Sequence, residues 1–149
     1  MDVTTEKLNV SQIEKFIELI HLFEEVFETE PRPVPNASHL KCLLEDIHFV
    51  VIVASVSGVI VAGLTAYVLE QYISERPLLY IYDLAVAKGY QRKGIGKQLI
   101  AEIKTYGTMM RAEEIFVQAD EGDLNALEFY RATHGTSEKV IHFYYSLVV

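Results

Sequence analysis

Two apolar runs joined by a two-residue turn limit the folds open to this chain more than any other feature. Phe49–Val56 and Val59–Leu69 contain no charged residue and are rich in β-branched side chains, and only Ser57 and Gly58 separate them. A link that short makes the two strands antiparallel neighbours in a hairpin. Neither run reaches the roughly 20 residues that a membrane span requires, so both are predicted to be buried strands.

The residues before this hairpin predict one short strand and two helices. A strand fits Val3–Asn9, and Ser11 and Glu14 have the Ser-x-x-Glu spacing of a capping box at the start of a helix that runs to about Phe27. Pro31 and Pro33 end that helix. A second helix fits Asn36–Asp46, with Asn36 or Ser38 as N-cap; the side chains expected in the core are Leu40, Cys42, Leu43, Leu44 and Ile47.

Helices and strands alternate after the hairpin. The predicted elements are a strand Leu78–Val86, a helix from about Gly94 to Tyr106, a strand Glu114–Ala119, a helix Leu124–Ala132 and a strand Lys139–Leu147. Antiparallel strands followed by a β-α-β unit predict an α/β fold, with a central mixed β-sheet and helices on both faces. We find no linker and no repeat, so residues 1–149 are predicted to be a single domain.

The charge of the chain is unevenly distributed. The net charge is −8, but residues 87–111 hold six basic side chains and one acidic, a balance of +5 that leaves −13 for the rest. An acidic chain is a poor partner for nucleic acid. One basic island instead suggests an anion there and a cation elsewhere, although acidic surface can also serve solubility alone. The lone Cys42 and the N-terminal residues, without a secretory or membrane signal, predict a cytoplasmic location.

The segment that follows the strand Leu78–Val86 is predicted to bind phosphate. Gly94 and Gly96 allow an anion to approach the backbone, and Arg92, Lys93 and Lys97 add positive charge. The start of a helix also offers free N–H groups and the positive end of its dipole. The spacing matches neither a Walker loop nor a dinucleotide-binding turn. The alternative is a turn that only packs the helix on the sheet.

The stretch Gln91–Gly96 resembles the Gln/Arg-x-x-Gly-x-Gly/Ala signature with which GNAT acetyltransferases hold the pyrophosphate of coenzyme A. The segment Asn125–Ala132 is similar to a second element of that family, Asn-x-x-Ala-x-x-Phe-Tyr-x-x-x-Gly, although Gly135 falls one place late. A closer likeness, to the gentamicin (aminoglycoside 3-N-) acetyltransferases, is carried by Tyr80–Val86, Val117–Asp120, Gly122 with Asp123, and Val140–Phe143.

This resemblance implies a GNAT acyl-coenzyme A N-acyltransferase fold, in which the strand before the phosphate turn carries a bulge and diverges from its parallel neighbour. It also implies acetyl-coenzyme A as cosubstrate, no metal, an aminoglycoside as acceptor, antibiotic resistance as the outcome, and a possible homodimer. Tyr130 would be the acid that protonates the departing thiolate. The residues that it places on the coenzyme are Leu84, Ala85, Val86, Gln91, Arg92, Lys93, Gly94, Ile95, Gly96, Lys97, Asn125 and Tyr130.

Asp83 is the only charged residue in the apolar stretch from Pro77 to Ala87. A carboxylate there is costly unless it is paired or lies at a binding site. Asp120 ends the next parallel strand, and the carboxyl ends of adjacent strands are where α/β sheets bind ligands. We therefore expect Asp83, Asp120, Glu121 and Asp123 to bind a cationic amine, with Asp83 as catalytic base or as anchor of the amine. Asp123 could instead be a helix N-cap, and Glu121 an exposed loop charge.

Several assignments stay open on the sequence. The acceptor could be another polyamine or a peptide amine, and a non-catalytic acyl-coenzyme A-binding module would need only the phosphate turn. Glu28 or Glu30, at the end of the first helix, could contact the acceptor. His142 is interpreted as a hydrogen-bonded structural histidine, and the other histidines lack metal-ligand spacing, so no metal is expected.

Overall fold

A computed structural model describes residues 1–148; Val149, the last residue of the predicted domain, lies outside the described residues. The chain divides into two compact units, Met1–Gln118 and a smaller one that begins at Ala119. The organisation of residues 1–149 as a single domain stays a prediction. None of the helices within residues 1–148 is long and apolar enough to cross a membrane.

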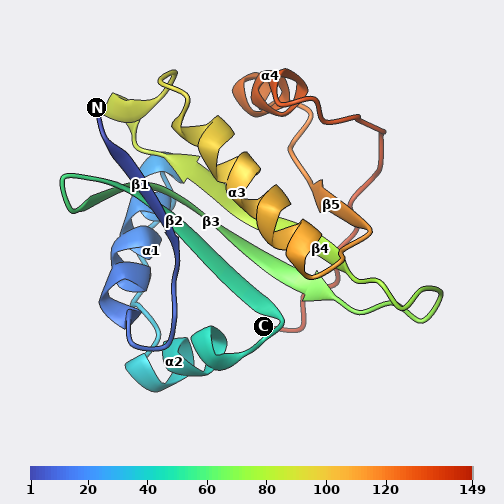
Figure 1. The fold of residues 1–149 in the computed structure, drawn as a ribbon, viewed down its shortest axis with the longest axis horizontal. Helices are drawn as coiled ribbons and strands as arrows, with labels where there is room; N and C mark the ends of the chain where they lie inside the picture. The colour runs from blue at the N-terminus through green and yellow to red at the C-terminus, as the bar shows by residue number, and fades with distance from the viewer. Residues whose placement is uncertain (149) are drawn as a thin grey trace. The chain divides into compact units, whose positions relative to one another are not determined.

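The first unit is built on a five-stranded mixed sheet with the order β1-β2-β3-β4-β5 (Figure 1). The first four strands pair antiparallel, and β5 runs parallel to β4. At the β2–β3 turn, Ser57 and Gly58 have φ values of 50° and 80°, the left-handed values that suit a two-residue hairpin. The predicted hairpin is therefore confirmed. The strands are β1 Val3–Lys7, β2 Phe49–Val56, β3 Val59–Leu69, β4 Leu78–Val86 and β5 Glu114–Val117.

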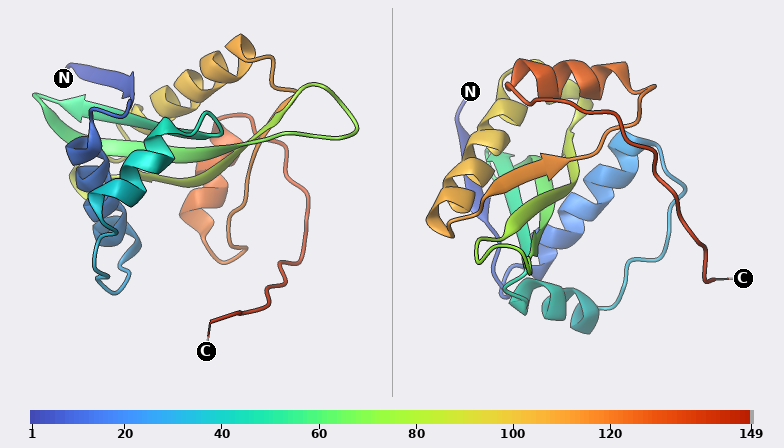
Figure 2. Two further views of the ribbon diagram at one scale, coloured as in Figure 1. Left: turned by 90° about the horizontal axis from the view of Figure 1, so that it is seen from below. Right: turned by 90° about the vertical axis from the view of Figure 1, so that its right-hand side faces the viewer.

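Helices cover both faces of this sheet. Figure 2 shows α1 (Ile13–Phe27) and α2 (Ala37–Glu45) on one face and α3 (Ile95–Met109) on the other. A short 3₁₀ turn, η1 (Lys88–Tyr90), connects β4 to α3. The chain therefore has the mixed α/β fold with helices on both faces that the sequence predicts.

The helix α1 approaches β3 closely because β3 has a glycine beneath it. A Cβ atom at Gly63 would lie 2.5 Å from Leu19 Cδ1 and 3.0 Å from the Ile52 carbonyl oxygen. Leu19 is fully buried there, in a core that also contains Phe16 and Phe49. This tight contact fixes α1, and with it one face of the sheet, against the middle of β3.

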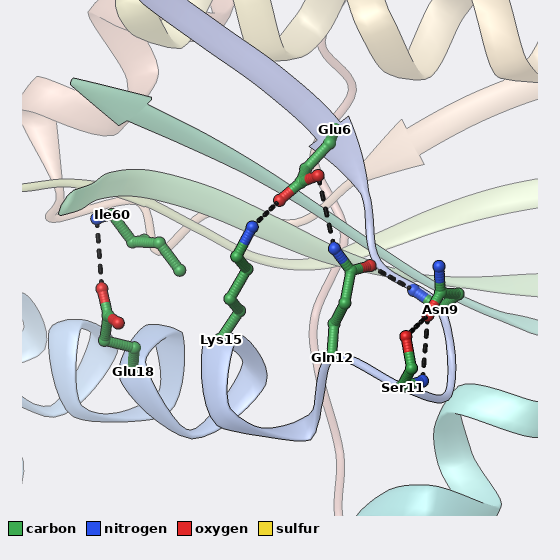
Figure 3. A network of polar contacts seen from close by, with 7 residues as sticks. All are labelled: Glu6, Asn9, Ser11, Gln12, Lys15, Glu18 and Ile60. Carbon is green, nitrogen blue, oxygen red and sulfur yellow. Dashed lines mark hydrogen bonds and ion pairs between the residues drawn. The ribbon is translucent and has the colours of Figure 1, made fainter. Parts of the chain in front are cut away.

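The start of α1 differs from the predicted capping box. The helix begins at Ile13, and its N-cap is Gln12 rather than Ser11. The Ser11 hydroxyl donates to Asn9 Oδ1 at 2.6 Å, so it is engaged in a local turn and unavailable to the helix. Figure 3 shows the polar network that replaces the box: Gln12 Nε2 donates to Glu6 Oε2 at 3.3 Å, and Lys15 Nζ donates to Glu6 Oε1. These contacts tie α1 to β1.

Two residues expected in the core of α2 are exposed. Cys42 has an exposed side chain, and Ile47 is 79% exposed. Successive residues of an α-helix are about 100° apart, so Cys42 lies on the side of α2 away from the buried Leu40. Ile47 follows the end of the helix at Glu45 and belongs to a turn. The N-cap prediction is confirmed, because Asn36 Oδ1 accepts from His39 N at 2.9 Å.

The described residues of the second unit, 119–148, contain one helix, α4 (Leu124–Ala132), with the predicted bounds. It ends in a Schellman motif: His134 N donates to the Arg131 carbonyl, and Gly135 N donates to the Tyr130 carbonyl at 2.9 Å. His134 has a φ of 71° and takes the left-handed position that glycine usually fills. Gly135 therefore stands one place later than in the family pattern because histidine occupies the turn.

The predicted strand Lys139–Leu147 is wrong. Residues 139–148 form neither helix nor strand, and their apolar side chains are exposed, from 66% at Val140 to 93% at Leu147. The apolar and aromatic pattern gives this segment a high strand propensity, but a strand also requires a paired neighbour. The described chain provides no such pairing for residues 139–148.

Candidate active site

Strand β4 carries a bulge that redirects Asp83. In the pairing with β3, Thr65 lies opposite Asp83 and Ala66 lies opposite Ile81, so Tyr82 is an extra residue without a partner. Strict alternation would place Asp83 on the same face as Ile81 and Leu79, and Leu79 is buried against Gly107 of α3. The bulge turns Asp83 toward the α1 face instead, as the burial of Ala85 in the α1 core confirms.

Asp83 is a half-buried carboxylate without a counter-charge among residues Met1–Gln118. No residue of Met1–Gln118 forms an ion pair or a hydrogen bond with its side chain. Partial burial removes water from the charged form and thereby raises the pKa of Asp83. The pKa of Tyr67 is also raised. Burial is the main cause, and the nearby Tyr82 and Asp83 add to it. Asp83 therefore has the environment of a group that would gain from a cationic partner and could accept a proton.

Strands β4 and β5 pair over a short length only. The parallel pairing runs from Leu78 with Glu114 to Ile81 with Val117 and then stops. Within Met1–Gln118, the stretch from Tyr82 to Val86 has no strand on that side. The bulge and the divergence that the resemblance implies are thus both confirmed. Backbone groups of Leu84 and Val86 lie along this opening, and Gln91 Nε2 donates to the Val86 carbonyl at 2.9 Å.

The turn between β4 and α3 has a backbone suited to anions. Arg92 and Gly94 both adopt left-handed conformations, with φ values of 61° and 84°. Alternating conformations of this kind curl successive N–H groups into a concave surface. No side chain caps α3, whose first turn therefore offers its N–H groups and the positive end of the helix dipole. Arg92, Lys93 and Lys97 are exposed around this turn, which suits a pyrophosphate.

An ion pair links this turn to the end of α1. Lys88 Nζ, in η1, donates to Glu28 Oε1 at 3.0 Å, although the two residues are 60 positions apart in the sequence. Glu28 follows α1 in a left-handed conformation with a φ of 54°. The acidic run that could border the acceptor is therefore tied to the basic turn, and one of its carboxylates already has a cationic partner.

Comparison with known proteins shows the family to which the chain belongs. Residues 14–135 match the model of the acetyltransferase (GNAT) family. The chain is a member of this GNAT family. No curated protein gives a match.

Three solved structures illustrate the relationship. An aminoglycoside acetyltransferase from an uncultured soil metagenomic sample, crystallised with trehalose and with sisomicin, is 50% identical, has a TM-score of 0.96, and is matched over 98% of this chain and 97% of that one. A second aminoglycoside acetyltransferase from an uncultured soil metagenomic sample is 35% identical, with a TM-score of 0.93 over 99% and 100% of the two chains. The ribosomal-protein-alanine N-acetyltransferase of Brucella melitensis biovar Abortus 2308 is 20% identical, with a TM-score of 0.74 over 95% and 100%, and shares the fold.

Five predicted site residues of this GNAT chain lie in the second unit, and their functional roles stay predictions. Asp123 is the N-cap of α4, where its Oδ1 accepts from Ala126 N at 3.1 Å, so the alternative interpretation of this residue holds. Asp120 and Glu121 lie in the loop before it, and Asn125 and Tyr130 lie on α4. The Tyr130 ring packs edge-on against Phe129, with centroids 5.1 Å apart.

Two surface hollows of the GNAT chain are lined by residues outside this site. Within residues 1–148 they measure about 400 and 340 Å³; one lies at the β3–β4 loop and the other beside the last turn of α3. No three His, Cys, Asp or Glu side chains of residues 1–148 gather in a way that could hold a metal ion.

Sequence reasoning missed Tyr82. Its side chain is 59% exposed at the bulge, next to Asp83. The one available signal was the alternation of Tyr80 and Tyr82 before the charged residue, but alternation alone cannot show where a bulge inserts an extra residue.

Proposed function

We propose that this GNAT acetyltransferase transfers the acetyl group of acetyl-coenzyme A to a primary amine of an aminoglycoside, the 3-amino group as in the gentamicin-type enzymes, and so confers antibiotic resistance. The observation that carries the proposal is the 50% identity, over 98% of the chain, to an aminoglycoside acetyltransferase crystallised with sisomicin. The acidic balance outside the basic turn suits a polycationic acceptor.

In this proposal the residues of the phosphate turn hold the pyrophosphate, and the open edge of β4 pairs with the pantetheine arm. Acetyl-coenzyme A supplies the acetyl group as a thioester. Asp83 anchors the acceptor ammonium and takes its proton, directly or through water, so that the neutral nitrogen can attack the carbonyl carbon. The Val86 N–H polarises the carbonyl oxygen. A C–N bond forms and the C–S bond breaks. Tyr130 gives its proton to the sulfur and regains one, through solvent, as the new amide nitrogen loses its second proton.

The coenzyme site is tested by Gly96→Val. A bulkier side chain at the first turn of α3 blocks close approach of phosphate, so coenzyme A affinity measured by calorimetry should fall strongly while the protein stays folded. Thr108→Val is the matched control, because Thr108 is exposed at the far end of the same helix. Unchanged affinity in folded Gly96→Val protein would remove the phosphate assignment.

The acceptor is identified by a panel of amines incubated with acetyl-coenzyme A, following release of free thiol and locating the new acetyl group by NMR. We expect turnover of aminoglycosides at the 3-amino group, with an apparent affinity that falls as salt rises. Equal turnover of neutral and polycationic amines would favour a peptide amine. Binding of the coenzyme without thiol release for any amine would favour a non-catalytic module.

Two further expectations belong to this proposal. A homodimer is expected, and the exposed apolar side chains of residues 139–148 support it, because monomeric proteins seldom leave such a run in water. A cytoplasmic location, which the sequence predicts, accompanies it.

A further inference from the structure

An unbroken row of aromatic rings crosses the sheet from α1 to β5. Phe16 on α1 contacts Phe49 on β2 with ring centroids 5.9 Å apart, and Phe49 contacts Tyr67 on β3 at 5.1 Å. Tyr67 meets Tyr82 of β4 at 5.7 Å. The row continues through Tyr80, 5.9 Å from Tyr82, and ends at Phe116 of β5, whose ring stacks on Tyr80 at 4.7 Å.

Burial changes along this row. Phe16 and Phe49 are 4% and 6% exposed and belong to the core, so packing explains them. Tyr82 is 59% exposed and stands on β4 just beyond Ile81, the last residue that pairs with β5. Tyr80 has its hydroxyl fixed by donation to Gln118 Oε1 at 3.3 Å, whereas the Tyr82 hydroxyl has no hydrogen bond within Met1–Gln118. Packing therefore does not account for an exposed ring at this position.

The bulge brings the exposed ring and the carboxylate to the same face. Tyr82 is the unpaired residue and Asp83 follows it, opposite Thr65. The Tyr82 ring stands nearly perpendicular to both Tyr67 and Tyr80, at 84° and 78°, so two neighbours hold its orientation. An ordered aromatic face next to an uncompensated carboxylate is the arrangement that attracts an organic cation: the ring quadrupole and the negative charge act on the same ligand.

We propose that Tyr82 is an acceptor-binding residue that holds an ammonium group of a polycationic amine against its ring, beside the amine that Asp83 receives. The inference rests on the proposed function for the identity of the acceptor. It makes Tyr82 a specificity-determining residue, since a second ammonium near the reacting one is present in aminoglycosides and absent from simple monoamines. Removal of the Tyr82 ring should raise the Kd for a polycationic amine by about threefold to thirtyfold.

The test compares Tyr82→Leu and Tyr82→Phe in the full-length protein, with Tyr72→Leu as matched control, because Tyr72 is fully exposed in the loop between β3 and β4. Kd for sisomicin is measured by calorimetry, and KM and kcat are measured for sisomicin and for a monoamine. Tyr82→Leu should raise Kd and KM for sisomicin by about threefold to thirtyfold, with the loss in kcat/KM carried by KM and a smaller effect on the monoamine. Tyr82→Phe, which keeps the ring, and Tyr72→Leu should bind like the parent protein.

The outcomes separate this inference from the proposed function. If the parent protein binds sisomicin without acetylating it, and Tyr82→Leu still weakens that binding, the proposed function fails and the inference stands. Unchanged Kd in Tyr82→Leu overturns the inference even if the protein acetylates aminoglycosides. Equal losses in Tyr82→Phe and Tyr82→Leu assign the effect to the hydroxyl and also overturn it. A thermal melt of each variant excludes loss of folding as the cause.

Discussion

At the scale of single residues, Asp83 combines a destabilising environment with a proposed chemical task. Burial raises the pKa of this carboxyl, so the folded protein binds its proton more tightly than the unfolded chain does. The resulting stabilisation is present at acid pH and is lost as pH rises through the raised pKa. Side chains that lower stability at neutral pH in this way are typically found at functional sites.

Asp83→Asn should therefore have opposite effects on stability and activity. At neutral pH the Tm should rise, because a neutral amide replaces a poorly solvated charge, and this gain should disappear at a pH below the ordinary pKa of an aspartate. kcat/KM for the amine should fall on the order of a hundredfold or more, and the acidic limb of its pH profile, which in the parent should lie above an aspartate's ordinary pKa, should vanish. Thermal melts and steady-state rates across pH check both. A weak effect with a normal acidic limb would assign proton transfer to water or to Asp120.

Tyr130→Phe should lower kcat while the affinity for the amine persists. Only a hydroxyl is removed, and the interaction proposed for it strengthens as the thiolate forms. Steady-state kinetics with calorimetric binding of the amine measure the two separately. Tyr145→Phe makes the same chemical change at an exposed tyrosine of the same unit and serves as control. Full activity in Tyr130→Phe would rule out this tyrosine as the acid.

At the scale of elements, the contact between α1 and β3 depends on one missing side chain. Gly63→Ala would place a Cβ 2.5 Å from Leu19 Cδ1 and 3.0 Å from a backbone carbonyl that cannot move aside. Overpacking of this kind costs about 1–3 kcal/mol, so Tm should fall by several degrees. In Gly89→Ala the added Cβ meets no atom within 4 Å, and Tm should stay unchanged. If Gly63→Ala and the parent protein had the same Tm, α1 would be shown to move away from the added Cβ without loss of stability.

The elements also show what sequence can and cannot predict. The bounds of β2, β3, β4 and α4 follow directly from apolar runs, turn residues and helical periodicity, because these signals are local. The bulge at Tyr82 could be expected only through the family resemblance, since it depends on the register between β3 and β4. Ser11 failed as a cap because Asn9 takes its hydroxyl, and residues 139–148 lack the neighbour that a strand requires. Of the candidate site, the phosphate turn was locally encoded, whereas Tyr82 was not.

At the scale of the whole molecule, the exposed segment after Gly135 is where we expect the contact of the proposed homodimer. Its apolar side chains are Val140, Ile141, Phe143, Tyr144, Tyr145, Leu147 and Val148, all at least 66% exposed. If they form the contact of the expected homodimer, a chain that stops after Lys139 should have half the parent's mass in light scattering and remain folded. Replacing the exposed Tyr72 and Ile73 by serine should leave the mass unchanged. If light scattering shows that the parent protein is a monomer, the dimer prediction is wrong.

The early end of the β4–β5 pairing has a consequence for how long the protein survives in a cell. From Tyr82 to Val86, β4 gives up the backbone hydrogen bonds that a full-length neighbour would supply. A molecule that lays an extended amide chain along this edge acts as a sixth strand, and it binds the native state alone. At a free concentration 100 times its Kd, such a molecule raises the free energy of unfolding by about 2.7 kcal/mol. Resistance to proteolysis and heat would then increase with the concentration of that ligand in the cell. A fall in its concentration would shorten the lifetime of the protein without any change in its sequence.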